Sequence, residues 1–493
     1  MTQGYPPSAD DGAALFRVPL ESWSSPDDML SCLGGGSAFL LESAGDPQSF
    51  SRWTMMGSHP VARFISRKGR NRFHWMSRGQ VWTWDEAPLA ALRRAMAAFP
   101  APASSEAIPF AGGAVGVLSY ELGRSLLPLH ASARDDLDLP ELSFFFFDRI
   151  LLFDRVEERG WALAYARGSS EKEATCEAEV RARLLAEETI ARMSDAEPVE
   201  DEPCGAGTMS LELSLDADAY RRAVGLCVEN VHAGEAYELC LTTRFETEFR
   251  GDARRLYREL RRRNPAPFAT FLRLPEATLV GSSPERFLKV SPDGRVEARP
   301  IKGTRPRGET PARDAALRAE LAGSRKDRAE NVMIVDLLRN DLSRVCATGS
   351  VEVPELCAIE DYASVFQMVS TITGRLAEGR DLFDLLASAF PGGSMTGAPK
   401  IAAMNILERL EPLVRGYYSG AAGYLGFDGS ADLSMVIRSV QIIGKRAMVG
   451  AGGAVLASSD PDMEWLEATA KARAPLEALA AAQGLELKGE WTQ

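Results

Sequence analysis

The sequence predicts a large mixed α+β fold in which antiparallel β-sheets form a sandwich core and helices pack outside. Its composition, 45% hydrophobic and 25% charged over 493 residues, is that of a globular protein with a large core. Short strand-like runs separated by turns fill the first third of the chain. Further along, strands and helices do not alternate strictly, which argues against a doubly wound parallel sheet.

The first third is predicted to be rich in antiparallel sheet. Leucine and alanine recur at helical spacing over residues 89–99, and Pro88 suits the first turn of that helix. Another helix is predicted at 169–193, where Glu, Ala and Arg dominate. Apolar and aromatic runs predict strands at 38–41, 71–75, 81–84, 142–147 and 150–153.

An acidic segment that contains proline and glycine but no apolar pattern marks the best domain boundary. We expect a sheet-rich N-terminal subdomain over 1–193, a linker over 194–208 and a second domain over 209–485. The second domain should contain strands and helices in mixed order. Helices are predicted at 216–231, 325–340 and 462–474, and strands at 237–245, at 278–281 and within 418–455.

Charge and targeting signals restrict the function. The net charge of -13 and the absence of a long basic block argue against nucleic acid as a partner. The polar N-terminus and the lack of any run of about 18 apolar residues predict a cytoplasmic protein with no membrane partner. The 7 cysteines are scattered without metal-ligand spacing, so we expect reduced, buried thiols.

One lysine stands out as a candidate reactive group. Lys302 lies in the stretch 298–308, between two prolines and next to Gly303, in backbone that predicts a shaped loop at a strand end. A free lysine, with a pKa of about 10.4, is a poor nucleophile, but burial or neighbouring cations would lower that pKa. The neighbouring cations are Arg299, Arg305 and Arg307. A solvated basic surface loop is the alternative, and this stretch alone favours neither.

Two of the predicted helices carry paired carboxylates. Asp327 and Glu330 are three residues apart and share a helical face, as do Glu464 and Glu467, with Lys471 four residues further on. Carboxylates on two packed helices can hold Mg²⁺, which typically takes one or two of them directly. Surface ion pairing with nearby Arg and Lys is the more probable interpretation for either helix alone.

The late strands carry a possible anion site. Arg438 suits a carboxylate, Tyr418 can add a hydroxyl donor, and Gly450 and Gly452 allow backbone N–H groups to approach an anion. The alternative is an ordinary strand arginine beside a glycine turn.

Taken in order, these motifs resemble those of the chorismate-utilising enzymes, a family that includes anthranilate, aminodeoxychorismate, isochorismate and salicylate synthases. The resemblance covers residues from about 210 to 479, roughly half of the chain. Its motifs are 234–242, 283–287, 299–304, 326–341, 390–400, 418–424, 437–439 and 459–471.

Within this family, Lys302 favours one branch. The run 300–304, Pro-Ile-Lys-Gly-Thr, resembles component I of aminodeoxychorismate synthases, whereas anthranilate synthases carry Ala at the lysine position. Isochorismate and salicylate synthases place a general-base lysine where this chain has Glu238. The run that contains Glu238 resembles a subset of aminodeoxychorismate synthases, others of which have Gln there.

The resemblance implies a role for each candidate residue. Lys302 would attack C2 of chorismate while Glu285 protonates the hydroxyl leaving C4, and ammonia would then attack C4 and expel the lysine. Mg²⁺ would join the ring carboxylate to Glu330 and Glu467, with Asp327 and Glu464 acting through waters. The remaining substrate contacts would come from Gly303, Thr304, Tyr418, Arg438, Gly450, Gly452 and Lys471.

The implied product is 4-amino-4-deoxychorismate, on the route to 4-aminobenzoate and folate, because no lyase segment follows in this sequence. No Gly-x-Cys-x-Gly elbow is present, so a separate glutamine amidotransferase subunit is expected to supply ammonia. One alternative is component I of anthranilate synthase. Another is a tryptophan-binding regulatory subunit without activity, against which the intact set of candidate residues argues.

The N-terminal half resembles the family more loosely, through residues 40–43 and 110–116. In relatives the first of these segments lines a tryptophan pocket, which implies a possible bound tryptophan here. The corresponding residues are Leu41, Glu42, Ser43, Pro265 and Phe268. An apolar strand end with a hydrogen-bonded glutamate is an equally good interpretation.

Overall fold

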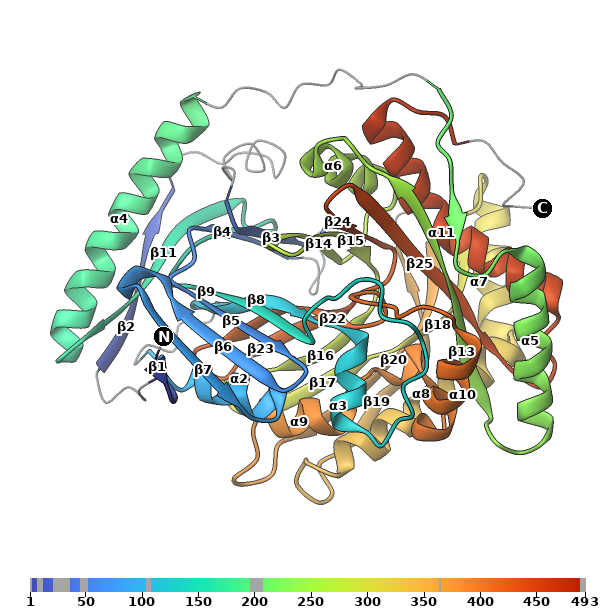
Figure 1. Cartoon of the computed structure of the whole chain (residues 1–493). Helices are drawn as coiled ribbons and strands as arrows, with labels where there is room; N and C mark the ends of the chain where they lie inside the picture. Colours follow the sequence, from blue (N-terminus) through green and yellow to red (C-terminus); the bar gives the residue numbers. More distant parts are fainter. Residues whose placement is uncertain are drawn as a thin grey trace.

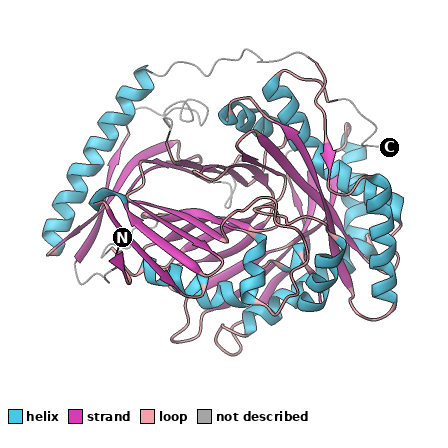
Figure 2. Ribbon diagram, viewed as in Figure 1, coloured by secondary structure: helices cyan, strands magenta, loops and turns pink. Residues whose placement is uncertain are grey.

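Two large β-sheets stacked face to face form the centre of the protein (Figures 1 and 2). The computed structural model describes residues 2–6, 12–20, 36–44, 52–102, 108–195, 207–362 and 365–487. The paired strands run antiparallel, apart from β1 (Thr2–Gln3) beside β7 (Gln80–Asp85). Helices cover the outer faces, so the predicted mixed α+β class with a sandwich core is confirmed.

The first sheet has the order β1-β7-β6-β5-β9-β8-β22-β23-β16-β17-β20-β18, and β19 pairs with β20. Its other strands are β5 (Ala62–Arg67), β6 (Arg70–Trp75), β8 (Gly113–Leu118), β9 (Leu142–Phe147), β16 (Arg286–Val290), β17 (Arg295–Arg299), β18 (Ile301–Pro306), β19 (Glu352–Asp361), β20 (Val365–Arg375), β22 (Ala421–Gly426) and β23 (Ala431–Met435).

The second sheet has the order β12-β13-β25-β24-β15-β14-β3-β4-β10-β11-β2, and β21 pairs with β13. Its strands are β2 (Gly12–Pro19), β3 (Ala38–Glu42), β4 (Trp53–Ser58), β10 (Arg149–Asp154), β11 (Arg159–Gly168), β12 (Glu212–Leu213), β13 (Glu238–Glu248), β14 (Phe268–Arg273), β15 (Thr278–Ser283), β21 (Gly397–Ala398), β24 (Ser439–Ile443) and β25 (Arg446–Val455).

Each sheet combines strands from before and after the expected linker. For example, β8 pairs with β22 in the first sheet and β3 pairs with β14 in the second. Residues 196–206 of that linker lie outside the described residues. The division at 1–193, 194–208 and 209–485 therefore stays a prediction about segments of the sequence.

The helices are distributed over the outer faces of both sheets (Figure 1). Helix α4 packs along β2 and β11 on one flank, while α5, α6 and α11 pack around β13, β15 and β25 on the opposite flank. Their bounds are α2 (Pro88–Met96), α3 (Gly123–Leu126), α4 (Glu171–Asp195), α5 (Ala217–His232), α6 (Ala253–Arg263), α7 (Pro311–Gly323), α8 (Arg325–Ser343), α9 (Leu382–Ala389), α10 (Lys400–Leu410) and α11 (Pro461–Gln483).

Strand β9 shows how the chain fills two cores at once. Its run of four phenylalanines is fully buried. Successive side chains of a strand point to opposite faces, so the four rings divide between two cores. Phe145 and Phe147 join the core between the two sheets, where they meet Phe39 of β3. Phe144 and Phe146 enter the core on the other face, beneath α2. Both faces of the first sheet are therefore buried away from water at β9.

The helices that carry the paired carboxylates form as expected, with one difference in length. Helix α8 begins after Ser324, whose hydroxyl accepts the Asp327 N–H, and α11 begins after Asp460, which caps it in the same way. Helix α11 continues beyond the predicted end at 474, through an internal proline, to Gln483. The extension is stabilised because Leu476 and Leu479 are fully buried against the second sheet.

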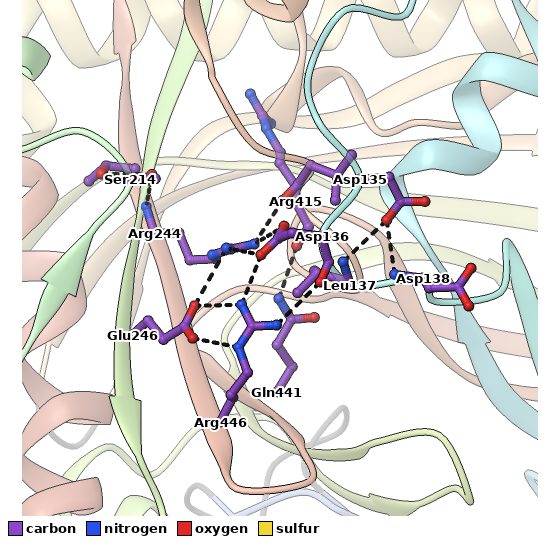
Figure 3. A network of polar contacts seen from close by, with 12 residues as sticks. Asp135, Asp136, Leu137, Asp138, Ser214, Arg244, Glu246, Arg415, Gln441 and Arg446 are labelled. Atoms are coloured by element: carbon purple, nitrogen blue, oxygen red, sulfur yellow. Dashed lines mark hydrogen bonds and ion pairs between the residues drawn. The ribbon is translucent and has the colours of Figure 1, made fainter.

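A polar network anchors the ends of β13 and β25 to the loop before β9 (Figure 3). Asp136 accepts two hydrogen bonds from Arg244 of β13, at 2.6 and 3.0 Å, and one from Arg446 of β25, at 2.8 Å. Arg446 also pairs with Glu246. The same two strands carry candidate residues of the site described below: β13 carries Glu238, and β25 carries Gly450 and Gly452.

Replacing Asp136 with asparagine is expected to lower the free energy of unfolding by about 3 kcal/mol, because Arg244 would become a poorly compensated buried charge. Burial raises the pKa of Asp136, but Arg244 and Arg446 hold it below its usual range. The contribution is therefore present at neutral pH and is lost as the pH falls through that low pKa. Urea unfolding measures it. Arg250→Gln, which breaks an exposed pair with Glu248, should leave the midpoint unchanged.

Among the described residues, no helix combines the length and apolar character that crossing a membrane requires. The cysteines that can be described are all unpaired, and Cys227, Cys240 and Cys346 are buried. The predicted cytoplasmic location stays a prediction.

Candidate active site

A cavity of about 470 Å³ lies where β18, β13, β25, α8 and α11 come together. It brings most of the candidate residues to one place, although they come from distant parts of the chain. The candidates that line it are Glu285, Lys302, Gly303, Thr304, Asp327, Glu330, Tyr418, Arg438, Gly450, Gly452, Glu467 and Lys471. Their individual roles remain predictions.

Lys302 lies on a strand and not, as the sequence predicted, in a loop. It belongs to β18, the last strand of the first sheet, whose pairing with β20 shifts register between Ile301 and Thr304. An edge strand tolerates the bulge and the neighbouring prolines because one side of its backbone needs no partner strand. Gly303 adopts a φ of +84°, and a Cβ there would lie 2.8 Å from Cγ of Asp327, so this position requires glycine.

The amine of Lys302 is buried against a carboxylate from the other sheet. Lys302 Nζ donates to Glu238 Oε1 at 2.9 Å, and the two side chains are 12% and 0% exposed. Burial alone lowers the pKa of Lys302, but the facing Glu238, together with Cys240 and Glu330, raises it above its usual value. The resting amine is therefore protonated and paired.

The expected effect of the three neighbouring arginines on Lys302 is wrong, because each is neutralised by a carboxylate of its own. Arg299 pairs with Glu360 and Arg307 with Asp314. Arg305 pairs with Glu320 and, at 3.1 Å, with Asp327. In this structure the carboxylate of Asp327 thus anchors β18 to α8, and its predicted contribution to a metal site stays a prediction.

Glu285 lies in the turn between β15 and β16 and faces the same cavity. The residue is 6% exposed, and burial raises the pKa of its carboxyl to about 7, although Ser394, Lys302 and Lys471 oppose the shift. A carboxyl with this pKa is partly protonated at neutral pH, so it can act as a general acid.

Arg438 and Tyr418 form one wall of the cavity together with β25. Arg438 has a φ of +51°, and its guanidinium donates to the carbonyl of Lys471 at 3.2 Å. Burial lowers its pKa, with Tyr418 and Glu467 opposing, and no ion pair to it is found among the described carboxylates. The guanidinium is therefore available to an anion.

The glycines of β25 permit close packing at this wall. A Cβ at Gly450 would lie 2.2 Å from the Tyr418 ring, and one at Gly452 would lie 2.0 Å from the carbonyl oxygen of Leu241 on β13. Neither position accepts a side chain without displacing a wall of the cavity.

The carboxylates of α8 and α11 gather next to β25. Glu330 is 8% exposed and lies 3.8 Å from Lys326, while Glu467 pairs with Lys471 at 2.6 Å. Glu464 does not line the cavity, but its Oε2 points at Gly453, where a Cβ would lie 2.6 Å from it and 3.6 Å from Glu467 Oε1. That Oε2 has no hydrogen-bond partner among the described residues.

These carboxylates fit a hard divalent cation. Burial raises the pKa of Glu330 to about 7, with Glu238 and Glu467 adding to the effect and lysines opposing it. Burial and the neighbouring carboxylates thus disfavour the charged form of Glu330, and a bound cation would favour it. In the part of the chain that can be described, no three His, Cys, Asp or Glu side chains converge closely enough to hold a metal by themselves. Mg²⁺ needs only one or two carboxylates, because waters and substrate oxygens complete its shell.

A second, smaller cavity of about 110 Å³ contains most of the residues expected around tryptophan. Leu41, Glu42, Ser43 and Phe268 line it, whereas Pro265 lines the larger cavity. Glu42 is buried, and its two oxygens accept from Tyr257 at 2.8 Å and from Arg261 at 2.9 Å, so its carboxylate is already satisfied.

The sequence interpretation did not include Glu238 among the candidate site residues. Its position was considered only as the place where other family members carry lysine. The available signal was an acidic residue directly before the apolar run Leu239-Cys240-Leu241, which is uncommon unless the charge has a partner. Which residue supplies that partner depends on how the two sheets pack.

Comparison with known proteins finds relatives over most of the chain. The sequence pattern of the chorismate binding enzyme family matches residues 36–477. An aminodeoxychorismate synthase of Streptomyces pristinaespiralis is 44% identical over 394 residues, which are 79% of this chain and 53% of that protein. The aminodeoxychorismate synthase component 1 of Salmonella typhimurium is 36% identical over 431 residues, 87% of this chain and 90% of that protein.

Among solved structures, anthranilate synthase component I from Streptococcus pneumoniae matches with a TM-score of 0.74 and 27% identity. The match covers 86% of this chain and 92% of that one. The chain spans about half the length of the Streptomyces proteins that it matches. With the match to the family pattern over most of its length, the chain belongs to the family of chorismate binding enzymes.

Proposed function

We propose that this chain aminates chorismate to 4-amino-4-deoxychorismate, using ammonia that a separate glutamine amidotransferase releases. The observation that carries the proposal is that Lys302, which is paired with the buried Glu238, lines the same cavity as the buried Glu285. A nucleophile and a proton donor on one cavity are what a substitution through a covalent intermediate requires. Similarity to proteins named aminodeoxychorismate synthase supports the same reaction.

Binding of the substrate follows from the charges of the cavity walls. Chorismate has two carboxylates. The guanidinium of Arg438, which forms no ion pair with a described carboxylate, suits the enolpyruvyl carboxylate together with Tyr418 and the N–H groups near Gly450 and Gly452. The ring carboxylate would face the carboxylates of α8 and α11. Glu330 and Glu467 would hold Mg²⁺ there, with Glu464 behind them, and the bound ion would supply charge neutralisation for that carboxylate.

The chemistry is a substitution in two steps. The neutral amine of Lys302 forms a bond to C2 as both ring double bonds shift and the C4–O bond breaks, and Glu285 gives its proton so that water leaves. Ammonia then forms a bond to C4, the two ring double bonds return, the C2–N bond to Lys302 breaks, and the new ammonium at C4 gives a proton back to Glu285. The net reaction consumes chorismate and ammonia and yields 4-amino-4-deoxychorismate and water.

Two partners belong to the proposal. The Salmonella relative is named component 1, which supports a companion subunit, and we assign that subunit the glutaminase role. Tryptophan is the proposed ligand of the smaller cavity, because Leu41, Ser43 and Phe268 offer an apolar and polar lining there. Titration calorimetry with tryptophan, on the wild type and on Ser43→Trp, would detect binding and its loss.

Incubation with chorismate, MgCl₂ and ammonium chloride tests the reaction without any partner subunit. We expect a product with the mass of 4-amino-4-deoxychorismate. Appearance of anthranilate fluorescence would instead identify an anthranilate synthase component I, the alternative that the Streptococcus structure favours. No conversion under any condition would leave a regulatory subunit as the function.

The pH dependence of kcat/KM reports on Glu285. Because burial raises its pKa to about 7, the proton needed for departure of the hydroxyl is present below that pH and is lost above it. The rate is therefore expected to fall tenfold per pH unit on the alkaline side. Glu285→Gln should lower kcat by about 10²–10⁴-fold and abolish this limb. A limb that persists in the variant would contradict the assignment.

A further inference from the structure

Glu238 holds a position that the two-step reaction does not yet explain. It begins β13, and its backbone is clamped by β21, since Glu238 pairs with Ala398 and a Cβ at Gly397 would lie 2.2 Å from the Glu238 carbonyl oxygen. Its side chain is fully buried and reaches across to the other sheet to accept from Lys302. Because its backbone is fixed and its side chain is buried, the carboxylate is held facing Lys302.

The second oxygen of this carboxylate is unused. Glu238 Oε2 has no hydrogen-bond partner among the described residues, so Lys302 alone compensates the charge of Glu238. In a site shielded from water, transfer of one proton from the ammonium to the carboxylate converts an ion pair into a neutral pair, and it leaves no isolated charge behind. The pair therefore stores the proton that the nucleophile must give up.

We propose that Glu238 takes the proton of Lys302 as the amine attacks the substrate and returns it when the lysine leaves. This inference rests on the proposed amination of chorismate. In the first step the N–H bond of the ammonium breaks and the O–H bond of Glu238 forms, which frees the nitrogen lone pair for C2. In the last step the C2–N bond breaks and the departing nitrogen recovers that proton, so the pair ends as it began.

No other group near Lys302 fits this role equally well. The charged or titratable groups that face it come from β13, α8, α11 and the turn after β15, and they are Glu238, Cys240, Glu330, Glu467 and Glu285. Burial raises the pKa of the Cys240 thiol, which keeps it protonated. Glu285 already carries the proton for the leaving hydroxyl, Glu467 is paired with Lys471, and Glu330 has no ion pair with Lys302 and is the proposed ligand of Mg²⁺.

The test compares Lys302 chemistry with and without substrate in the wild type, Glu238→Gln and Glu238→Asp. A pulse of acetic anhydride at a series of pH values, followed by peptide mass spectrometry, reports the fraction of neutral Lys302 amine. Loss of the facing charge should move the midpoint of labelling down by about 1–3 pH units in Glu238→Gln. Glu235→Gln, at an exposed position in the bend before the same strand, should leave the midpoint unchanged.

Rates with chorismate and ammonium complete the test. In Glu238→Gln, kcat should fall by about 10²–10⁴-fold, and the remaining rate should rise with pH along the labelling curve of that variant, because bulk solvent then has to remove the proton. Glu238→Asp should recover part of the rate. A role confined to orienting Lys302 would lower the rate without linking its pH profile to labelling.

Two outcomes overturn the proposal. One is a Lys302 labelling midpoint that does not move in Glu238→Gln, which would show that the two side chains are uncoupled whatever the substrate is. The other is a Glu238→Gln enzyme within threefold of wild-type kcat. A third result separates this proposal from the proposed amination. If the wild type does not convert chorismate but Glu238→Gln still moves the labelling midpoint, the amination is wrong and the coupling of Lys302 to Glu238 stands.

Discussion

Lys302→Met is expected to lower kcat with ammonium by at least about a thousandfold, because no other amine in the cavity can form the bond to C2. Two other lysines line the cavity and both face carboxylates: Lys471 donates to Glu467 and to the Gly452 carbonyl, and Lys326 lies 3.8 Å from Glu330. Product formation is followed by chromatography. Lys172→Met, on the exposed side of α4, should retain full activity.

Misfolding is the obvious objection to this variant, since Lys302→Met leaves Glu238 as a buried charge without a partner, at a cost of about 3–5 kcal/mol. The double variant Lys302→Met with Glu238→Gln removes both charges and should regain stability in urea while remaining inactive. Recovery of activity in the double variant would contradict a nucleophilic role for Lys302.

Removal of divalent metal is the second change with a large expected effect. Dialysis against EDTA should reduce turnover to background, and Mg²⁺ should restore it, because the ring carboxylate of the substrate would otherwise face Glu330 and Glu467 without neutralisation. Glu330→Gln should raise the Mg²⁺ concentration at half-maximal rate by about tenfold to a hundredfold or more. Titration of the metal-free enzyme with MgCl₂ measures both effects.

Asp336→Asn provides the control on the same helix. Asp336 has a side chain that is 82% exposed and pairs only loosely with Arg339 at 3.7 Å, so its loss should leave the Mg²⁺ dependence unchanged. Full activity in EDTA would show that the reaction needs no metal ion. An unaltered Mg²⁺ requirement in Glu330→Gln would show that Glu330 does not hold it.

The parts of the site that depend on local sequence could be predicted. The spacing of the carboxylates placed them correctly on α8 and α11, because a three-residue interval determines the helical face whatever the helix packs against. The class of the fold was also predictable, since β9 and its neighbours carry strand-like runs bounded by turns. Figure 2 shows the two resulting sheets with the helices packed around them.

Features that depend on tertiary packing could not be predicted. The prolines around Lys302 indicate a loop unless the strand is known to lie at the edge of a sheet, where proline and a bulge are tolerated. The pairing of Lys302 with Glu238 joins the two sheets across 64 residues of sequence, and no local pattern encodes it. The three arginines near Lys302 were expected to act on it because the sequence does not reveal their carboxylate partners.

Mass spectrometry of the intact protein with chorismate and Mg²⁺, but without ammonia, tests the central claim most directly. Without the second nucleophile, the covalent intermediate should accumulate, and the protein should gain the mass of chorismate less one water. Peptide mapping should place the added mass on Lys302, and added ammonium should remove it with release of 4-amino-4-deoxychorismate. An unmodified protein that still turns over when ammonium is supplied would contradict the account.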